Sequence, residues 1–263
     1  MNEITAQTAL ITGASSGMGA DFARQLAERG TNLVLVARRE ERLKQLRDSI
    51  LEKHSVQIHV ISADLANPEA RQILFESLQS RSIQIDILIN NAGLGVYGKF
   101  VKTPWDKTNN MLHLDIVALT HLTRLFAEDM VKRGKGHVLL VASTGAFQPT
   151  PTYAAYAAAK SYVLSFGEAL NYELKSTGVN CTVLCPGVTE TEFFDVSGQK
   201  MTFSQKITKM KSEKVVRIGL NAMFNRKPCV VAGRMNAFMA WNTRLYPRKM
   251  VTSIAAFLMG KPE

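Results

Sequence analysis

Short apolar runs alternate with longer amphipathic stretches along most of the chain. The apolar runs are rich in Val, Ile and Leu and cover 9–11, 32–37, 56–62, 86–90, 136–142, 179–185 and 228–232. Runs this short and this continuously apolar are typical of strands buried on both faces of a sheet. We therefore predict seven strands.

The stretches between these runs have helical periodicity and helix-boundary residues. They cover 17–29, 39–53, 68–80, 104–132 and 152–176. Gly30 follows the first stretch as a C-terminal cap, and Pro68 stands in the first turn of the third. Strands that alternate with helices predict an α/β fold, with a doubly wound parallel sheet of seven strands and helices on both faces.

Two later segments depart from this alternation. Residues 189–226 are polar, helix-prone and rich in lysine, with scattered apolar side chains: Phe193, Phe194, Met201, Phe203, Ile207 and Met210. We interpret this segment as an excursion over the site that acts as a substrate lid. Residues 234–263 form a basic, amphipathic C-terminal segment. There is no internal repeat or flexible linker, so we expect one domain spanning 1–263.

The composition fits a globular protein of the cytoplasm. The chain has 263 residues, 46% of them apolar, and no apolar run approaches the ~20 residues that span a bilayer. The first residues lack the features of a secretory signal. Cys181 and Cys185 fall on one predicted strand, about 13 Å apart, which is too far for a disulfide. We expect reduced thiols.

Positive charge is concentrated at the end of the chain. Residues 200–263 carry 13 Lys and Arg against two acids, a net of +11, and the remaining residues carry a net of −1. This excess is either a solvated basic surface or an attraction for anionic partners, such as a phosphorylated substrate carrier or a membrane surface. Nucleic acid is disfavoured, because no arginine-rich run with interleaved aromatics is present.

A glycine-rich turn follows the first predicted strand. It contains Gly13, Ser15, Ser16, Gly17, Met18 and Gly19, with the spacing G-x-x-x-G-x-G. Glycines let the backbone approach a pyrophosphate, and the following helix N-terminus favours its negative charge. The pattern favours dinucleotide binding over a turn without a ligand.

Two arginines end the second predicted strand, where a carboxylate would bind the ribose 2′-hydroxyl of NAD(H). Arg38 and Arg39 would instead pair with a 2′-phosphate through charge-assisted hydrogen bonds. The prediction is NADP(H) rather than NAD(H), and the alternative is two surface arginines at the start of a helix.

Tyr156 and Lys160 lie four residues apart in a predicted helix, and Ser143 lies thirteen residues before Tyr156. Positions i and i+4 share one helix face. An ammonium beside a phenol favours the phenolate and lowers its pKa toward the working pH, which makes the phenol a usable acid and base.

Taken together, these motifs resemble the short-chain dehydrogenase/reductase family over essentially the whole chain. Asn90-Asn91-Ala92-Gly93 and Pro186-Gly187-x-x-x-Thr191 extend the match, and the first third is also similar to ketoacyl reductases. The resemblance implies a Rossmann fold and these roles: Tyr156 as acid and base, Ser143 as donor to the substrate carbonyl, and Lys160 as modulator of Tyr156 and ligand of the nicotinamide ribose.

The resemblance also implies further cofactor contacts. These residues are Asp64, Leu65, Asn91, Ala92 and Gly93 on the adenosine side, and Pro186, Gly187, Val188 and Thr191 at the nicotinamide end. Asp115 takes the position where the family usually has a catalytic asparagine. An aspartate cannot donate a hydrogen bond unless protonated, and its charge near Lys160 would alter the pKa of Tyr156.

We expect an NADP(H)-dependent oxidoreductase acting on a carbonyl or alcohol substrate with an apolar body. The alternative is a catalytically weak NADP(H)-binding sensor, favoured only by Asp115. We expect no metal site, since His113 and His121 lack nearby ligands at suitable spacing. The resemblance suggests a homo-oligomer. The C-terminal segment packs on the body or a partner subunit, with weak peripheral membrane contact as the alternative.

Overall fold

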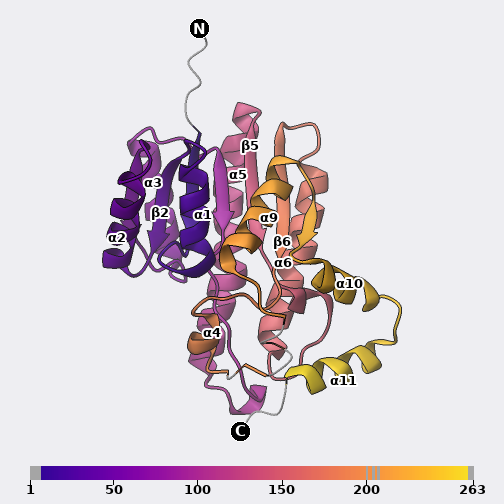
Figure 1. Cartoon of the computed structure of the whole chain (residues 1–263). Helices are drawn as coiled ribbons and strands as arrows, with labels where there is room; N and C mark the ends of the chain where they lie inside the picture. Colours follow the sequence, from indigo (N-terminus) through magenta and orange to yellow (C-terminus); the bar gives the residue numbers. More distant parts are fainter. Residues whose placement is uncertain (1–6, 200, 203–204, 206–207, 260–263) are drawn as a thin grey trace.

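A computed structural model describes residues 7–199, 201–202, 205 and 208–259. One parallel sheet runs through the molecule in the order β3-β2-β1-β4-β5-β6-β7 (Figure 1). Its strands are β1 (Thr8–Thr12), β2 (Asn32–Ala37), β3 (Ile58–Ser62), β4 (Ile87–Asn90), β5 (Gly136–Val141), β6 (Val179–Cys185) and β7 (Cys229–Val231). The predicted seven-stranded parallel sheet is confirmed.

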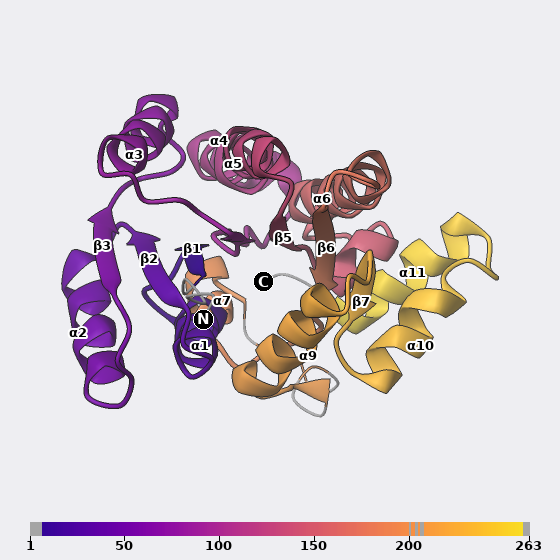
Figure 2. The same cartoon turned by 90° about the horizontal axis from the view of Figure 1, so that it is seen from above.

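Helices cover both faces of this sheet, as Figure 2 shows. One layer holds α1 (Gly17–Ala27), α2 (Glu40–Leu51) and α9 (Ser212–Phe224), and the other holds α3 (Pro68–Ser80), α5 (Leu119–Arg133) and α6 (Ala154–Glu173). Because side chains alternate along a strand, Ala9 and Ile11 enter the first core while Leu10 enters the second. Both faces are therefore apolar, which explains the continuous apolar runs of the sequence.

The long helical stretch predicted over 104–132 is not one regular helix. It consists of α4 (Trp105–Leu112), a π-helical turn η2 (His113–Ala118) and α5. A π turn widens the helix by one residue per turn and is frequent at functional sites. In this chain it contains Asp115, which is fully buried.

The excursion predicted over 189–226 ends earlier than expected. Residues from Ser212 onward form α9, whose Val215, Val216 and Leu220 are buried against the sheet. The periodicity of α9 is that of a core helix, and its two cations, Lys214 and Arg217, are exposed to solvent. Before it, α7 (Phe193–Ser197) is a short helix whose Phe193 and Phe194 line the same cavity as the loops that follow the strands. The predicted lid residues Phe203 and Ile207 lie outside the described residues.

The remaining elements lie around the edges of this core. Two short 3-10 turns, η1 (Phe100–Lys102) and η3 (Thr144–Phe147), belong to loops after β4 and β5. Two helices, α10 (Arg234–Asn242) and α11 (Arg248–Met259), follow β7 and project beyond the body (Figures 1 and 2).

The three cysteines are free thiols. Cys181 and Cys185 lie on β6, as predicted, and the Sγ atom of Cys185 lies 4.0 Å from that of Cys229 on β7. Burial raises the pKa of the Cys181 thiol to about 12. Among the described residues, no helix combines the length and hydropathy needed to cross a membrane.

Candidate active site

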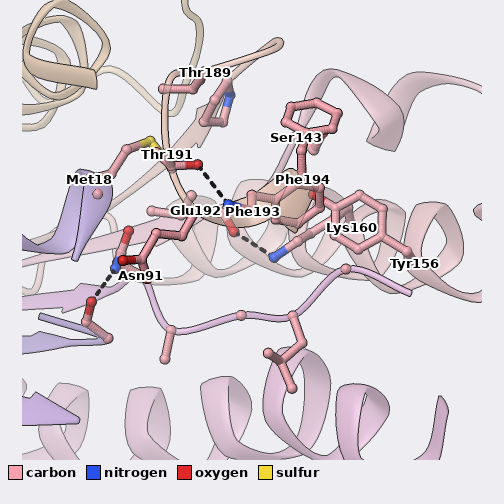
Figure 3. Close-up of a pocket in the computed structure, with 18 of the residues that line it drawn as sticks. Met18, Asn91, Ser143, Tyr156, Lys160, Thr189, Thr191, Glu192, Phe193 and Phe194 are labelled. Atoms are coloured by element: carbon pink, nitrogen blue, oxygen red, sulfur yellow. Dashed lines mark hydrogen bonds between the residues drawn. The ribbon is translucent and has the colours of Figure 1, made fainter. Parts of the chain in front are cut away.

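A cavity of about 420 Å³ opens at the carboxyl ends of the strands. The strand order reverses direction between β1 and β4, and ligands of doubly wound sheets bind outside such a switch point. The cavity is lined by all of the predicted site residues except Gly19 and Asp115. In Figure 3, Met18 and Asn91 lie on one side of it, and Tyr156 and Lys160 on the other.

The glycine-rich turn has the backbone that a pyrophosphate cradle needs. Gly13 and Gly17 have φ of +67° and +50°, a conformation that other residues rarely adopt. A Cβ atom on Gly19 would lie 2.2 Å from the Gly13 carbonyl oxygen, so α1 starts closer to the turn than any side chain would allow. This absence of side chains leaves the N-terminal amides of α1 open to the cavity and fits a bound diphosphate.

The turn is fixed from the neighbouring strand. The Nδ2 atom of Asn91, just after β4, donates to the Thr12 carbonyl oxygen at 2.9 Å. The Thr12 hydroxyl in turn accepts from the backbone amides of Asn91 and Ala92. These contacts hold the ends of β1 and β4 together at the switch point, so the two segments form one continuous wall.

Arg39 joins three segments at the mouth of the cavity. Its guanidinium donates to the hydroxyls of Ser15 and Ser16, the closer at 2.8 Å, and to a carboxylate oxygen of Glu192 at 2.9 Å. Arg42, one turn further along α2, pairs with the other oxygen of Glu192. Arg38 also lines the cavity. Arg39 and Arg42, together with the hydroxyls of Ser15 and Ser16, form a cationic site, the arginine pocket.

Glu192 and Arg42 did not emerge from the sequence. The pKa of Glu192 is lowered to about 2 by its hydrogen bonds to Arg42 and then Arg39, so this carboxylate stays charged near neutral pH. Arg42 was detectable in principle, because it lies three residues after Arg39 on the same helix face. Glu192 was not, because it is about 150 residues away in sequence.

The three residues Ser143, Tyr156 and Lys160 lie together in the same cavity. Tyr156 and Lys160 come from one face of α6, with Lys160 Nζ 5.6 Å from the centroid of the Tyr156 ring. Ser143 lies at the start of the loop after β5, just before η3, and its hydroxyl accepts from the Gly145 amide at 3.1 Å. The hydroxyl remains a donor for a further partner.

The protonation of Tyr156 differs from the simple prediction. Burial raises the pKa of the phenol above its usual value; Lys160 and the Ser143 hydroxyl lower it, and Asp115 raises it. The expectation that the nearby ammonium sets a lowered pKa is therefore wrong for this arrangement. The helical spacing indicates the effect of Lys160, and the sequence also pointed to Asp115, but the desolvation that outweighs Lys160 follows only from burial in the folded chain.

Asp115 lies behind the cavity and binds Lys160 directly. One of its oxygens is 2.9 Å from Lys160 Nζ, and the other accepts from the Leu94 amide at 2.8 Å. Burial opposes the charge of Lys160, but Asp115 and Tyr156 attract it and keep its pKa raised. Burial likewise raises the pKa of Asp115, opposed by Lys160 and the Leu94 amide. Within this buried pair, Lys160 therefore keeps its proton and its positive charge.

An aromatic wall closes the cavity next to Tyr156. The Phe193 and Tyr153 rings lie 5.4 Å and 5.5 Å from the Tyr156 ring, and Phe194 packs edge-on against Phe193. The Tyr153 hydroxyl donates to Oε1 of Gln199 at 2.9 Å and lies 3.1 Å from the Ser197 hydroxyl, and burial raises the pKa of Tyr153 to about 12. Tyr153 is therefore part of the aromatic wall, and its hydroxyl connects this wall to α7 and to the residues just after α7. Among the residues described, no cluster of His, Cys, Asp or Glu is arranged to hold a metal.

Comparison with known proteins decides the family. Residues 7–202 match the family model described as short chain dehydrogenase. The chain belongs to this family. Membership makes it an oxidoreductase of the kind that exchanges a hydride between a nicotinamide cofactor and a hydroxyl or carbonyl group.

Three relatives illustrate the range of this short-chain dehydrogenase family. A very-long-chain 3-oxoacyl-CoA reductase of Anas platyrhynchos is 29% identical over 94% of the chain and 78% of its own length. A 17-beta-hydroxysteroid dehydrogenase type 3 of Mus musculus is 30% identical over 81% and 70%. A short-chain dehydrogenase from Sphingobium yanoikuyae, solved in complex with NADPH, is 32% identical, covers 91% and 94%, and superposes with a TM-score of 0.81.

Proposed function

We propose that this short-chain dehydrogenase is NADP(H)-dependent and interconverts a carbonyl and an alcohol on a substrate with an apolar body. One observation carries the proposal: Ser143, Tyr156 and Lys160 line the same cavity as the glycine-rich turn and the arginine pocket. A cofactor with its diphosphate at the turn would reach both the arginines and the phenol.

The residues for the cofactor divide along the cavity. Gly13, Ser16 and Gly17 would bind the diphosphate with backbone amides of the turn. Arg38 and Arg39 would bind a 2′-phosphate, with Arg42 close to them on α2. Asp64 and Leu65 would flank the adenine, and the loop from Pro186 to Thr191 would hold the nicotinamide end. The relative solved with NADPH supports this choice of cofactor.

When bound, the nicotinamide supplies or accepts the hydride. The phenol of Tyr156 donates a proton to the substrate oxygen in reduction and takes one back in oxidation. The Ser143 hydroxyl donates to the same oxygen as negative charge develops on it. Lys160, held by Asp115 and the Val141 carbonyl, keeps a positive charge near the phenol and stabilises its ionised form.

The aromatic wall indicates the class of substrate. The rings of Tyr153, Phe193 and Phe194 form an apolar surface next to the Tyr156 phenol. This surface has few groups that could hydrogen-bond to a polar substrate. Two relatives are named for substrates with large apolar bodies, a very-long-chain 3-oxoacyl-CoA and a steroid. We propose a ketoacyl or similar long-chain carbonyl compound, with α7 and the segment around it as the lid.

The oligomeric state and the cellular location of the protein stay predictions. We propose a homo-oligomer built through the long helical region and α6, as the family resemblance suggests, and a cytoplasmic location. Sedimentation velocity of the purified protein measures the first, and fractionation of cells that express it measures the second.

Replacement of the phenol tests the proposed reaction. Tyr156→Phe should lower turnover of a ketone or ketoacyl thioester by about 10²–10⁴, because the acid and base are lost, while NADPH still binds. Steady-state kinetics and a fluorescence titration with NADPH measure the two quantities.

The matched control is Tyr153→Phe, which removes a hydroxyl from the same wall but not from the proposed acid. It should retain turnover within a few-fold of wild type. If Tyr156→Phe instead turned over as fast as wild type, or if no carbonyl compound in a broad panel were reduced, the enzymatic proposal would be rejected in favour of the nucleotide-sensing alternative.

A further inference from the structure

The two helices that follow β7 carry an unusual outer surface. We define the C-terminal apolar surface as the exposed large apolar side chains of α10, α11 and their connection, represented by Met235, Phe238, Trp241, Leu245, Ile254 and Phe257. Phe257 is 86% exposed and Phe238 61% exposed. Scattered apolar residues are normal on a protein surface, but such a dense set on two neighbouring elements marks an interaction site.

These helices reverse the usual amphipathic order. Their few buried positions hold Asn236 and Ala240 in α10 and Val251 and Ala255 in α11, whereas the aromatic and other large apolar side chains face outward. The exposed surface is therefore not needed to attach the helices to the body. The two helices also project from the molecule (Figures 1 and 2), so the surface is accessible to a large, flat partner.

The charges on this segment are all positive. Residues 234–259 contain Arg234, Arg244, Arg248 and Lys249 and no acidic residue. All four cations are exposed, and none forms an ion pair with a residue in the described part of the chain. Apolar and aromatic side chains surrounded by cations match the interface of an anionic lipid layer, where both kinds of side chain find partners.

The polar groups of α11 are compatible with such a layer. The hydroxyls of Thr252 and Ser253 donate to the carbonyls of Arg248 and Lys249, at 2.8 Å and 3.1 Å, and need no water. A second copy of the chain fits less well, because a two-fold contact through this surface would bring two sets of cations together with no carboxylate from the same segment to pair them.

We propose that α10 and α11 dock the protein on an anionic lipid surface. The apolar side chains enter the headgroup region and the four cations contact lipid phosphates. The end of α11 also reaches the cavity, where Met259 is a lining residue and its carbonyl accepts from Gln199. Docking would therefore bring the cavity close to lipid-dissolved substrates, and this last consequence rests on the proposed function.

Vesicle flotation tests the docking without any turnover. The full chain should float with vesicles of phosphatidylcholine mixed with phosphatidylglycerol, float less with phosphatidylcholine alone, and be released by salt. The double variant Trp241→Ser/Phe257→Ser and the double variant Arg248→Glu/Lys249→Glu should each bind the mixed vesicles about tenfold or more weakly. Ile73→Ser, which alters an exposed apolar residue of α3, is the matched control and should bind as wild type.

A fluorescence measurement needs no disruptive substitution. The chain has two tryptophans, Trp105 and Trp241, so Trp105→Phe leaves Trp241 as the sole reporter. Its emission should shift to the blue when mixed vesicles are added, because the indole leaves water. An unchanged spectrum together with no flotation overturns the proposal.

Sedimentation velocity completes the test. Wild type could sediment as a dimer that the Trp241→Ser/Phe257→Ser variant dissociates. If wild type also failed to bind vesicles, the C-terminal apolar surface would join two copies of the chain, and the proposal would be overturned. Because Tyr156→Phe leaves the C-terminal apolar surface unchanged, it should float like wild type. Failure of docking is therefore distinguishable from failure of the enzymatic proposal.

Discussion

At the residue scale, Asp115 sets the electrostatics of the site without lining it. Its carboxylate lies 2.9 Å from Lys160 Nζ, inside the π-helical turn η2, and contributes to the raised pKa of Tyr156. An asparagine in the same place would keep an oxygen for the Leu94 amide but remove the charge. Asp115 therefore shifts the pKa of Tyr156, and it does not take over the hydrogen-bond donation that an asparagine would supply.

Asp115→Asn should shift the pH profile rather than abolish activity. Since the Asp115 carboxylate raises the pKa of Tyr156, its removal lowers that pKa. Alcohol oxidation needs the phenolate, so its acid limb should move to lower pH, and turnover should stay within about tenfold of wild type. Initial rates from about pH 7 to about pH 11, which follow the rise toward a phenol pKa above ~10, measure the shift. A shift to higher pH would contradict this role of Asp115.

Glu192 competes with the proposed 2′-phosphate for the same arginines. Glu192→Gln should free Arg39 and Arg42 and tighten NADPH binding by about fivefold, the magnitude of a partly exposed ion pair, with little effect on NADH. Titration of both cofactors at equal salt measures it. Glu190→Gln, which breaks a contact with Lys209 instead, is the matched control. If wild type bound NADH as tightly as NADPH, the assignment of the arginine pocket would fail.

At the element scale, α7 is held over the cavity by a contact that needs a glycine. A Cβ atom on Gly95, in the loop after β4, would lie 2.3 Å from Cζ of Phe193. Phe193 begins α7 and also contacts Tyr156, so this loop and α7 together determine how closely the aromatic wall approaches the phenol.

Gly95→Ala should push Phe193 and α7 away from the phenol. We expect KM for an apolar ketone to rise about tenfold, from a loss of packing worth roughly 1.4 kcal/mol, with NADPH affinity nearly unchanged. Steady-state kinetics measure both. In the double variant Gly95→Ala/Phe193→Ala the clash is absent, so it should be no worse than Phe193→Ala alone. Additive losses would show that the contact is not the cause.

At the scale of the whole molecule, the cavity is assembled from segments that only the sheet brings together. The glycine-rich turn follows β1, Arg39 lies between β2 and α2, Ser143 follows β5 and Glu192 follows β6. A cofactor that contacts these segments stabilises the folded chain by mass action, because the unfolded chain has no such site.

Saturating NADPH should therefore raise the melting temperature of the protein. At a hundredfold excess over Kd the gain is about 2.7 kcal/mol, equivalent to roughly 5–10 °C for a chain of this size. NADH at the same concentration should give a smaller shift. Differential scanning fluorimetry measures both, and Arg39→Ala should bring the two shifts closer together. Equal shifts in wild type would contradict the predicted preference.

The sequence by itself determined the fold and many of the residues that line the cavity. The strands 32–37 and 179–185 and the helix 68–80 have the predicted boundaries, because apolar runs and helix-start residues are local signals. The glycine turn and the Tyr156–Lys160 pair were likewise readable, since each depends on spacing within one element.

Only the tertiary structure decided the electrostatics of the site and where the segment after β6 gives way to the core helix α9. The Asp115–Lys160 and Arg39–Glu192 contacts join residues that are distant in sequence. The raised pKa of Tyr156 and the packing of α9 on the sheet depend on burial, which follows from the packed chain as a whole. Local patterns specify elements, whereas charge and desolvation depend on which elements meet.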